Sequence, residues 1–235
     1  RKGDSSAVLY ELSTENDAEV TVHAVNYVSQ KMVKTFEAFR FQPDGWTFPT
    51  WFDAAGQEVP ARLVLSPIKD YDQITSLVGD GRGHSGMDFK APVGSEVTSP
   101  WDGQVVRVNW NVRYNGDCVE LSARGKKVRF LHLSALGAGI KAGASVKAGQ
   151  VIGLSGNTGR SFAPHLHYEI EDGNGRTRDP LKEHETTRRT LPEGSRVAFD
   201  AEVARLRAAL AAQVVETITP APAGAATPAP AATPI

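Results

Sequence analysis

The sequence has a single cysteine, Cys118, among its 235 residues. One thiol cannot form a disulfide within the chain, and it cannot supply the cysteine sets of zinc fingers. Because Cys118 lies in the alternating, strand-like stretch 117–121, we interpret it as a small residue in a sheet. Any metal site in this chain must therefore be built from carboxylates and from its 6 histidines.

Net charge and long apolar runs are also missing. The 26 Lys and Arg residues nearly balance the 27 Asp and Glu residues, leaving a formal net charge of −1. This balance lacks the positive field that attracts nucleic acid, so we expect no nucleic acid partner. No apolar run approaches the roughly 20 residues of a membrane-spanning helix, so we expect no membrane span. The chain begins with Arg1 rather than with methionine, which is compatible with an export signal that has been removed.

Alternating patterns and glycine turns indicate an all-β protein with two β-rich parts. Residues 1–61 contain alternating stretches at 20–25 and 36–41, which predict a small N-terminal β domain. Residues 62–182 hold most of the glycine and predict an antiparallel sheet or sandwich. The strands that we expect in this second part are 93–98, 104–109, 118–122, 127–133, 150–154 and 166–170.

The C-terminal part differs in character. Within residues 183–218, Phe199, Val203, Leu206, Leu210 and Val214 recur at helical spacing, which predicts an amphipathic helix over 198–217 with Asp200 as its cap. Its apolar face would pack on the body of the protein or on a protein partner. Residues 219–235 are almost entirely Ala, Pro and Thr, which is typical of a flexible tail, and we assign them no chemistry.

Two histidines, His165 and His167, stand at the start of the expected strand 166–170. Side chains two apart on a strand share a face, so His165, His167 and Glu169 should point one way, while Leu166, Tyr168 and Ile170 face the core. Paired imidazoles suit a metal site or an acid/base pair, and the spacing alone leaves that choice open.

Two further motifs add candidates in the same glycine-rich part. His84 and Asp88 are four residues apart, and we expect a loop that enters a strand at Asp88. Two histidines and an aspartate are a normal zinc ligand set that leaves a fourth position for water. His132 should share a strand face with Phe130 and Ser134, which by itself is typical of a core histidine. Four histidines in three strand-like segments of one region nevertheless indicate a common site.

Together these motifs resemble the lysostaphin/LytM-type zinc metallopeptidases, a family of cell-wall endopeptidases with a β-rich fold. The resemblance covers roughly residues 62–182. It is carried by His84-x-x-x-Asp88, Phe130-Leu131-His132-Leu133-Ser134, Gly156-Asn157-Thr158-Gly159 and His165-Leu166-His167-Tyr168-Glu169. It implies that His84, Asp88 and His167 bind one zinc ion per chain. It further implies that His132 and His165 are the two active-site histidines that do not bind the metal.

The resemblance implies a zinc-dependent endopeptidase that cuts the peptide cross-links of bacterial peptidoglycan, exported to the periplasm, the cell envelope or the medium. Zinc-activated water would attack the scissile carbonyl while His132 and His165 transfer protons or stabilise the oxyanion, in roles that the sequence does not divide between them. Glu169 is our candidate for fixing the tautomer of a ligand histidine, and the alternative is an ordinary surface carboxylate. We expect the loops 110–116 and 155–164 to form the walls of the substrate groove.

Other interpretations compete with this one. Some relatives of this fold have lost their ligands and activate other wall hydrolases instead, but here all five positions are present. A phosphocarrier domain could use a histidine pair, but it has no need of His84 with Asp88. We favour a D,D cross-link over a glycine bridge as the substrate because glycine bridges are the narrower class.

Two smaller expectations concern the flanking parts. Residues 1–61 precede the peptidase-like region, and we hypothesise that they restrain it by covering the groove. His184 and Glu185 begin like the helical His-Glu-x-x-His zinc motif, but Arg188 stands where its second histidine belongs. We therefore interpret His184 as a solvent-exposed residue.

Overall fold

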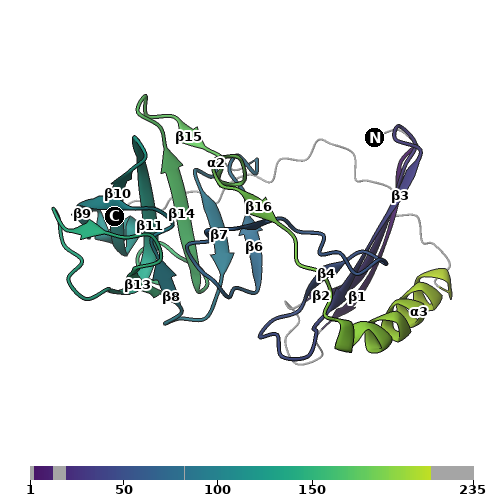
Figure 1. The fold of residues 1–235 in the computed structure, drawn as a ribbon. Coiled ribbons are helices and arrows are strands. Elements are labelled where there is room, and N and C mark those ends of the chain that lie inside the picture. Colours follow the sequence, from purple (N-terminus) through teal and green to yellow (C-terminus); the bar gives the residue numbers. More distant parts are fainter. Residues whose placement is uncertain (1–2, 13–19, 82, 213–235) are drawn as a thin grey trace, which may run out of the picture.

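The computed structural model describes residues 3–12, 20–81 and 83–212. They form three sheets, of four, ten and two strands, in which all neighbouring strands are antiparallel (Figure 1). The expected all-β fold with a C-terminal helix is confirmed. The strands are β1 (Ser5–Leu12), β2 (Val20–Ser29), β3 (Lys34–Phe41), β4 (Thr50–Phe52), β5 (Arg62–Leu63), β6 (Gln73–Ser76), β7 (Met87–Lys90), β8 (Glu96–Thr98), β9 (Gly103–Val108), β10 (Asp117–Ala123), β11 (Lys126–Leu136), β12 (Ser145–Val146), β13 (Val151–Ser155), β14 (His165–Glu171), β15 (Thr177–Arg178) and β16 (Thr186–Thr187).

The helices are short except for the last. They are α1 (Val112–Asn115), α2 (Pro180–Glu183) and α3 (Arg196–Ala212), with a 3-10 turn at Glu193–Ser195 directly before α3. None of the helices in the described ranges is long and apolar enough to cross a membrane.

The large sheet has two chemically different faces. Its main path runs β12-β9-β10-β11-β14-β7-β6. Along β14, Leu166, Tyr168 and Ile170 are fully buried in the core, together with apolar residues of β7, β10 and β11. His165, His167 and Glu169 alternate with them and therefore lie on the opposite face, as the sequence pattern predicts.

Strand β11 departs from this alternation at His132. Opposite β10, Phe130 pairs with Val119 and Leu133 pairs with Asp117, so two residues of β11 face one of β10. The extra residue makes a β-bulge, and His132 has a φ of 64°, in the left-handed region. Phe130 and Leu133 are both in the core, whereas His132 turns to the other face. The expectation that Phe130 and His132 share a face is therefore wrong, because the bulge shifts the alternation by one residue.

The N-terminal sheet and α3 share a second, separate hydrophobic core. Phe199, Val203 and Leu206 of α3 are buried with residues of the sheet β1–β4 and of the segment that precedes α3: Ala24, Phe39, Phe52 and Leu191. The apolar face of α3 is thus covered by this chain itself, and the protein partner that we expected for this helix stays a prediction. The boundaries at residues 61, 182 and 218 also stay predictions, and Val214 and the tail 219–235 lie outside the described residues.

The helix α3 begins at Arg196, earlier than expected. Asp200 is therefore not its cap, and that prediction is wrong. Its carboxylate instead pairs with the Arg196 guanidinium one turn away, at 2.9 Å. The 3-10 turn that follows Pro192 extends the helical segment towards the N-terminus, which a search for apolar periodicity alone does not reveal.

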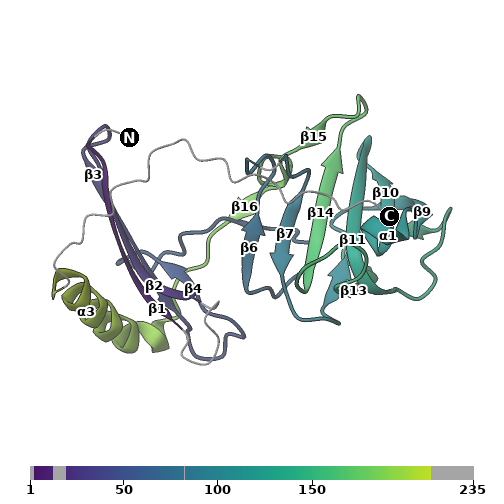
Figure 2. The ribbon, with the colours of Figure 1, turned by 180° about the vertical axis from the view of Figure 1, so that it is seen from behind.

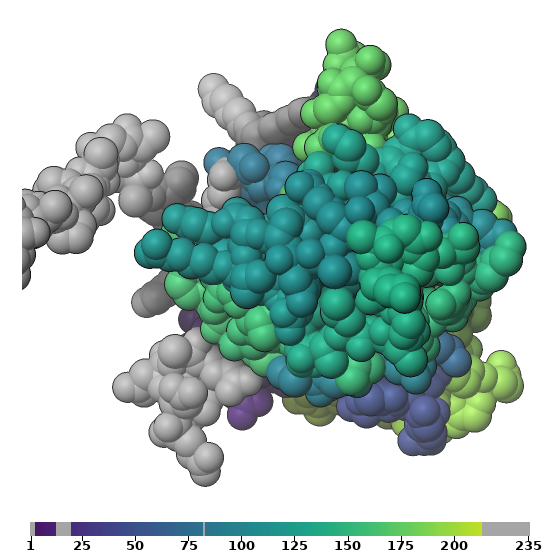
Figure 3. All heavy atoms as spheres, turned by 90° about the vertical axis from the view of Figure 1, so that its left-hand side faces the viewer, coloured from purple at the N-terminus to yellow at the C-terminus, as the bar shows by residue number. Residues whose placement is uncertain are grey.

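The two cores lie at opposite ends of the molecule. Figures 1 and 2 show the N-terminal sheet and α3 beyond β6, on the side away from β9, β10 and β13. In Figure 3, which views the other end, the teal and green residues of the large sheet fill the centre, and purple and indigo N-terminal residues show only at the lower edge. The small sheet pairs β5, which precedes the strands of the large sheet in the sequence, with β16, which follows them.

Candidate metal centre

Three ligand-type side chains meet on the polar face of the large sheet. Asp88 of β7 is the direct cross-strand partner of His167 of β14, and His84 reaches them from the loop before β7. The Asp88 Oδ1 atom lies 2.8 Å from His167 Nδ1 and 3.2 Å from His84 Nε2. The two imidazole nitrogens, His84 Nε2 and His167 Nδ1, are 3.1 Å apart. The expected loop that enters a strand at Asp88 is thus present.

These separations fit a tetrahedral zinc ion. Donor atoms held about 2.0–2.1 Å from such an ion lie about 3.3 Å from one another, close to the three distances found here. Two imidazoles and one carboxylate are also a donor set that zinc favours. Within the part of the chain that the structure describes, these three residues are the one group of His, Cys, Asp and Glu close enough to share an ion.

Contacts behind each imidazole decide which nitrogen faces the cluster. His84 Nδ1 donates to the Leu77 carbonyl oxygen at 3.3 Å, and His167 Nε2 donates to Glu169 Oε1 at 3.0 Å. The carbonyl and the carboxylate accept only, so each must meet an N–H. This leaves His84 Nε2 and His167 Nδ1 turned towards Asp88, and Glu169 has the tautomer-fixing position that we predicted for it.

The carboxylates around His167 are ionised at neutral pH. Burial alone would raise the pKa of Glu169, but hydrogen bonds from His167, Ser85 and Arg129 lower it to about 2. Burial likewise opposes the charge of Asp88, but the hydrogen bond from His167 and the charges of His167, His165 and His84 together outweigh it and lower that pKa. Burial would lower the pKa of His167, but its bonds to Asp88 and Glu169 raise it to about 9. His167 Nδ1 and Asp88 Oδ1 therefore share a proton. A metal cation that bound these two atoms would take the place of that proton.

His132 and His165 flank this cluster. Their ring centroids are 4.8 Å apart, and His132 lies 6.0 Å from the His167 ring. Each ring is held through Nδ1, which donates to the carbonyl oxygen of Thr158 at 2.9 Å in His132 and to that of Ala163 at 2.7 Å in His165. Their Nε2 atoms are therefore left for other partners. The structure thus brings together all five residues that the resemblance implies.

The loops expected to wall a groove contact each other directly. Thr158 Oγ1 accepts a hydrogen bond from the Asp117 backbone at 3.0 Å, and Arg160 donates to the Tyr114 carbonyl at 2.9 Å. Beside them a cavity extends over the sheet from Glu169 and Leu131 to Arg107 and Trp110. Leu131 is the cross-strand partner of His167, so this cavity adjoins the metal cluster.

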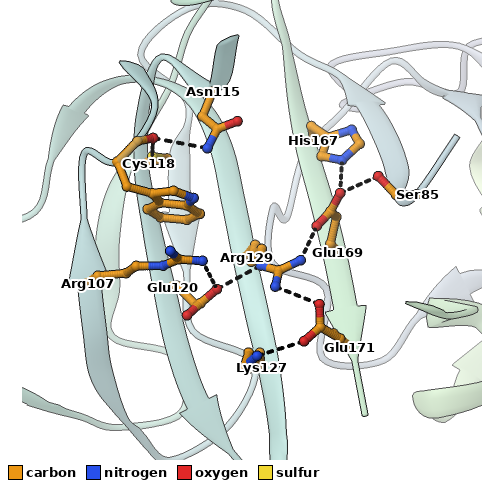
Figure 4. Close-up of polar contacts among 11 residues, drawn as sticks. Ser85, Arg107, Asn115, Cys118, Glu120, Lys127, Arg129, His167, Glu169 and Glu171 are labelled. Atoms are coloured by element: carbon orange, nitrogen blue, oxygen red, sulfur yellow. Dashed lines mark hydrogen bonds and ion pairs between the residues drawn. The ribbon is translucent and has the colours of Figure 1, made fainter. Parts of the chain in front are cut away.

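Two contacts of Glu169 were missed from the sequence. Ser85, next to His84, donates its hydroxyl to Glu169 Oε1, and Arg129 Nη1 donates to Glu169 Oε2 at 2.9 Å (Figure 4). Glu169 therefore links the loop that carries His84 to the strand that carries His167. The alternation of β11 and β14 places Arg129 and Glu169 on one face, but only the strand pairing brings them opposite each other.

His184 is buried, so its interpretation as a solvent-exposed residue is wrong. Its exposed fraction is 9%, its ring stacks on Trp101 with centroids 4.5 Å apart, and Nε2 accepts a hydrogen bond from the Tyr168 hydroxyl at 2.9 Å. Tyr168 lies on the core face of β14, so His184 is on the opposite side of the sheet from His167. It satisfies a buried hydroxyl and takes no part in the metal cluster.

Comparison with known proteins identifies the same region. Residues 82–180 match the model of peptidase family M23. The chain is 30% identical over 214 residues to the peptidoglycan DD-endopeptidase ShyB of Vibrio cholerae, which covers 86% of this chain and 48% of ShyB. It is 40% identical over 92 residues to the glycyl-glycine endopeptidase ALE-1 of Staphylococcus capitis, covering 38% of this chain and 25% of ALE-1.

Among solved structures, a zinc containing peptidase from Vibrio cholerae is 31% identical, covers 76% of this chain and 56% of its own, and has a TM-score of 0.45. The chain spans less than half the length of the curated relatives that it matches.

Proposed function

Residues 82–180 of this chain form a domain of peptidase family M23, and from that premise we propose that the chain is a zinc-dependent endopeptidase acting on the peptide cross-links of bacterial peptidoglycan. The observation that carries the proposal is the meeting of His84, Asp88 and His167 at ligand distances with His132 and His165 beside them. Five side chains from one loop and three strands converge there. If each histidine had only a separate structural role, they would not need to meet at one place.

The chemistry divides between an ion and the chain. A zinc ion held by His84, Asp88 and His167 would make a water nucleophilic at neutral pH and polarise the scissile carbonyl. His132 and His165 present Nε2 to the same space, and we assign them proton transfer from the attacking water and to the leaving amine. The carbonyls that hold both Nδ1 atoms keep the two rings aimed there. Glu169 keeps the Nδ1 atom of His167 turned towards Asp88.

The extent of similarity supports a D,D cross-link as the substrate. The alignment with ShyB covers 86% of the chain, and so extends well beyond the M23 domain, whereas that with ALE-1 covers 38%. A relative that resembles both parts of this molecule is thus named for D,D bonds. Because peptidoglycan lies outside the cytoplasmic membrane, we place the protein in the periplasm or cell envelope, or secreted beyond it.

Digestion of purified sacculi of known chemistry tests the proposal. We expect new amino termini, identified by mass spectrometry, from the amine side of D,D cross-links. Chelation should abolish the digestion, and added zinc should restore it. His84→Ala should lose both zinc and activity, whereas His132→Ala should keep zinc and lose activity. If His84→Ala supported wall hydrolysis as well as the natural chain does, the alternative of a non-catalytic activator would be preferred.

A further inference from the structure

A row of alternating charges crosses four strands next to the metal cluster (Figure 4). Arg107 of β9 pairs in register with Glu120 of β10, which pairs with Arg129 of β11, which pairs with Glu169 of β14. Ion pairs at 2.9, 2.7 and 2.9 Å follow the same order. The row begins at the residue that holds His167 and ends in the cavity beside it.

The two arginines of the row differ in what they have left to offer. Arg129 uses Nε, Nη1 and Nη2 on three carboxylates, those of Glu120, Glu169 and Glu171. Arg107 bonds only to Glu120, through Nη2, among the described residues, although a guanidinium has five N–H donors. The Arg107 side chain is 45% exposed. Of the two arginines, Arg107 is therefore the one with N–H groups left to bind a ligand.

Arg107 is also held in place. Its guanidinium stacks on the Trp110 ring, 4.3 Å from the centroid, and the carboxylate that fixes it belongs to Glu120, whose side chain is 3% exposed. Both Arg107 and Trp110 line the cavity that starts at Glu169 and Leu131. An oriented guanidinium with free donors, set in a groove, suits a carboxylate better than a neutral group because its planar fork matches the two oxygens.

We propose, on the basis of the function proposed above, that Arg107 is a specificity-determining residue that binds a free carboxylate of the substrate peptide. Glu120, to which Arg107 is bonded, is on a strand two positions from β14. With strands about 4.8 Å apart, Glu120 lies about 10 Å from Glu169, its in-line residue on β14, and His167 stands two residues further along that strand. The carboxylate site is therefore about 12 Å from His167, or three to four residues of extended peptide. Stem peptides joined through acidic residues carry free carboxylates at such a distance from a D,D bond, whereas a glycine bridge carries none.

Two cross-linked peptides test this, one with the free carboxylate three to four residues from the scissile bond and one with a carboxamide in its place. The zinc-loaded natural chain should cleave the acid with a kcat/KM about tenfold above that of the amide, the scale of one hydrogen bond to a charged group. Arg107→Gln should bring this ratio close to one, and Arg107→Lys should recover part of it. Arg178→Gln is the matched control, because Arg178 is 47% exposed and also paired with a single glutamate. It should keep the ratio of the natural chain.

Binding of both peptides to the His132→Ala variant separates this proposal from the function. A preference for the acid that disappears when Arg107→Gln is added supports the carboxylate site even if neither peptide is cleaved by the natural chain. Failure of cleavage with zinc bound would count against the endopeptidase function alone. Equal kcat/KM and equal binding for acid and amide in the natural chain, or an unchanged preference in Arg107→Gln, would overturn the proposal.

Discussion

Glu169 is a carboxylate that organises the candidate metal site without being one of its three candidate ligands. It accepts hydrogen bonds from His167, Ser85 and Arg129, so it joins a ligand, the loop of a second ligand and the neighbouring strand. Outer contacts of this kind hold the ligand ring in the orientation that the ion needs before the ion arrives. The geometry of the candidate metal site therefore depends also on residues other than its three candidate ligands.

We expect Glu169→Gln to weaken zinc binding about 10- to 100-fold, the range typical for loss of such an outer partner. Competition with a chromophoric chelator measures the Kd directly. Glu171→Gln is the control, because Glu171 stands two residues further on the same strand and pairs with Arg129 and Lys127, but not with a ligand. Similar zinc affinities in the two variants would show that the contact of Glu169 with His167 does not contribute to zinc binding.

Because His184 is buried, we expect the free energy of unfolding to decrease in mild acid. Burial lowers its pKa to about 4, aided by the nearby charge of Arg124. In the unfolded chain His184 binds a proton near pH 6.5. The free energy of unfolding therefore decreases as the pH falls from 6.5 to 4, by about 3 kcal/mol over the whole range. His184→Gln keeps an acceptor for Tyr168 and should flatten the fall in unfolding free energy over this range. His23→Gln, which removes a histidine outside the hydrophobic cores, should leave it as in the natural chain. An equal slope in His184→Gln would contradict the prediction.

At the level of elements, the position of His132 depends on two loops that fit closely. Gly159 has a φ of 72°, and a Cβ placed on it would overlap the backbone of Gly116 in the facing loop. The neighbouring Thr158 supplies the carbonyl that holds His132. A side chain at position 159 would thus separate the loops and move the acceptor of His132.

Gly159→Ala should therefore reduce hydrolysis about 100-fold, since a shift of about 1 Å in a catalytic group has that effect. Gly175→Ala is the control, because Gly175 has a φ of 76° with nothing within 4 Å of its Cβ position. Both variants should lose about 1–2 kcal/mol of stability from the left-handed backbone. Only Gly159→Ala should have a reduced rate of hydrolysis per folded molecule. An equal reduction in Gly175→Ala would contradict the role given to Gly159.

The elements that local pattern determines were predictable, and those that depend on pairing were not. The faces of β14 follow from strict alternation around His167, which is a property of the sequence itself. The bulge at His132 is a property of how β11 meets β10, and the sequence of β11 alone cannot show it. The burial of His184 likewise depends on Trp101 from a distant segment. Arg107 escaped notice because its significance comes from the strand register, which places it in line with Glu169.

For the molecule as a whole, α3 makes the N- and C-terminal parts interdependent. Removing residues 1–61 alone would expose Phe199, Val203 and Leu206, which now share a core with the N-terminal sheet. A test of the restraint hypothesis should therefore remove 1–61 and 193–235 together. The hypothesis predicts faster hydrolysis of sacculi per zinc-loaded molecule after this double truncation, and rates equal to those of the full chain would remove it.

Glu58 forms a buried polar link between these parts. Its carboxylate is fully buried and pairs with Arg62 of β5 at 2.9 Å and with Arg189, after β16, at 2.8 Å. Burial alone would raise the pKa of Glu58, but the hydrogen bonds from Arg189 and Arg62 outweigh it and lower the pKa to about 2. An unfolded chain protonates this carboxylate near pH 4.5, so the stabilisation is complete above that pH and is lost as the pH falls from 4.5 to 2.

Glu58→Gln should lower the free energy of unfolding at pH 7 by about 3–5 kcal/mol, because it leaves two guanidiniums without their buried counter-charge. It should also remove much of the decline in stability between pH 4.5 and 2, since the group that titrates there is gone. Denaturant titrations at a series of pH values measure both effects. Glu183→Gln removes a more exposed partner of Arg178 and Lys126 and should cost less than about 1 kcal/mol. If the two variants lost similar stability at pH 7, the link through Glu58 would be no stronger than a surface ion pair, and the two cores would owe their connection to β5, β16 and α3 alone.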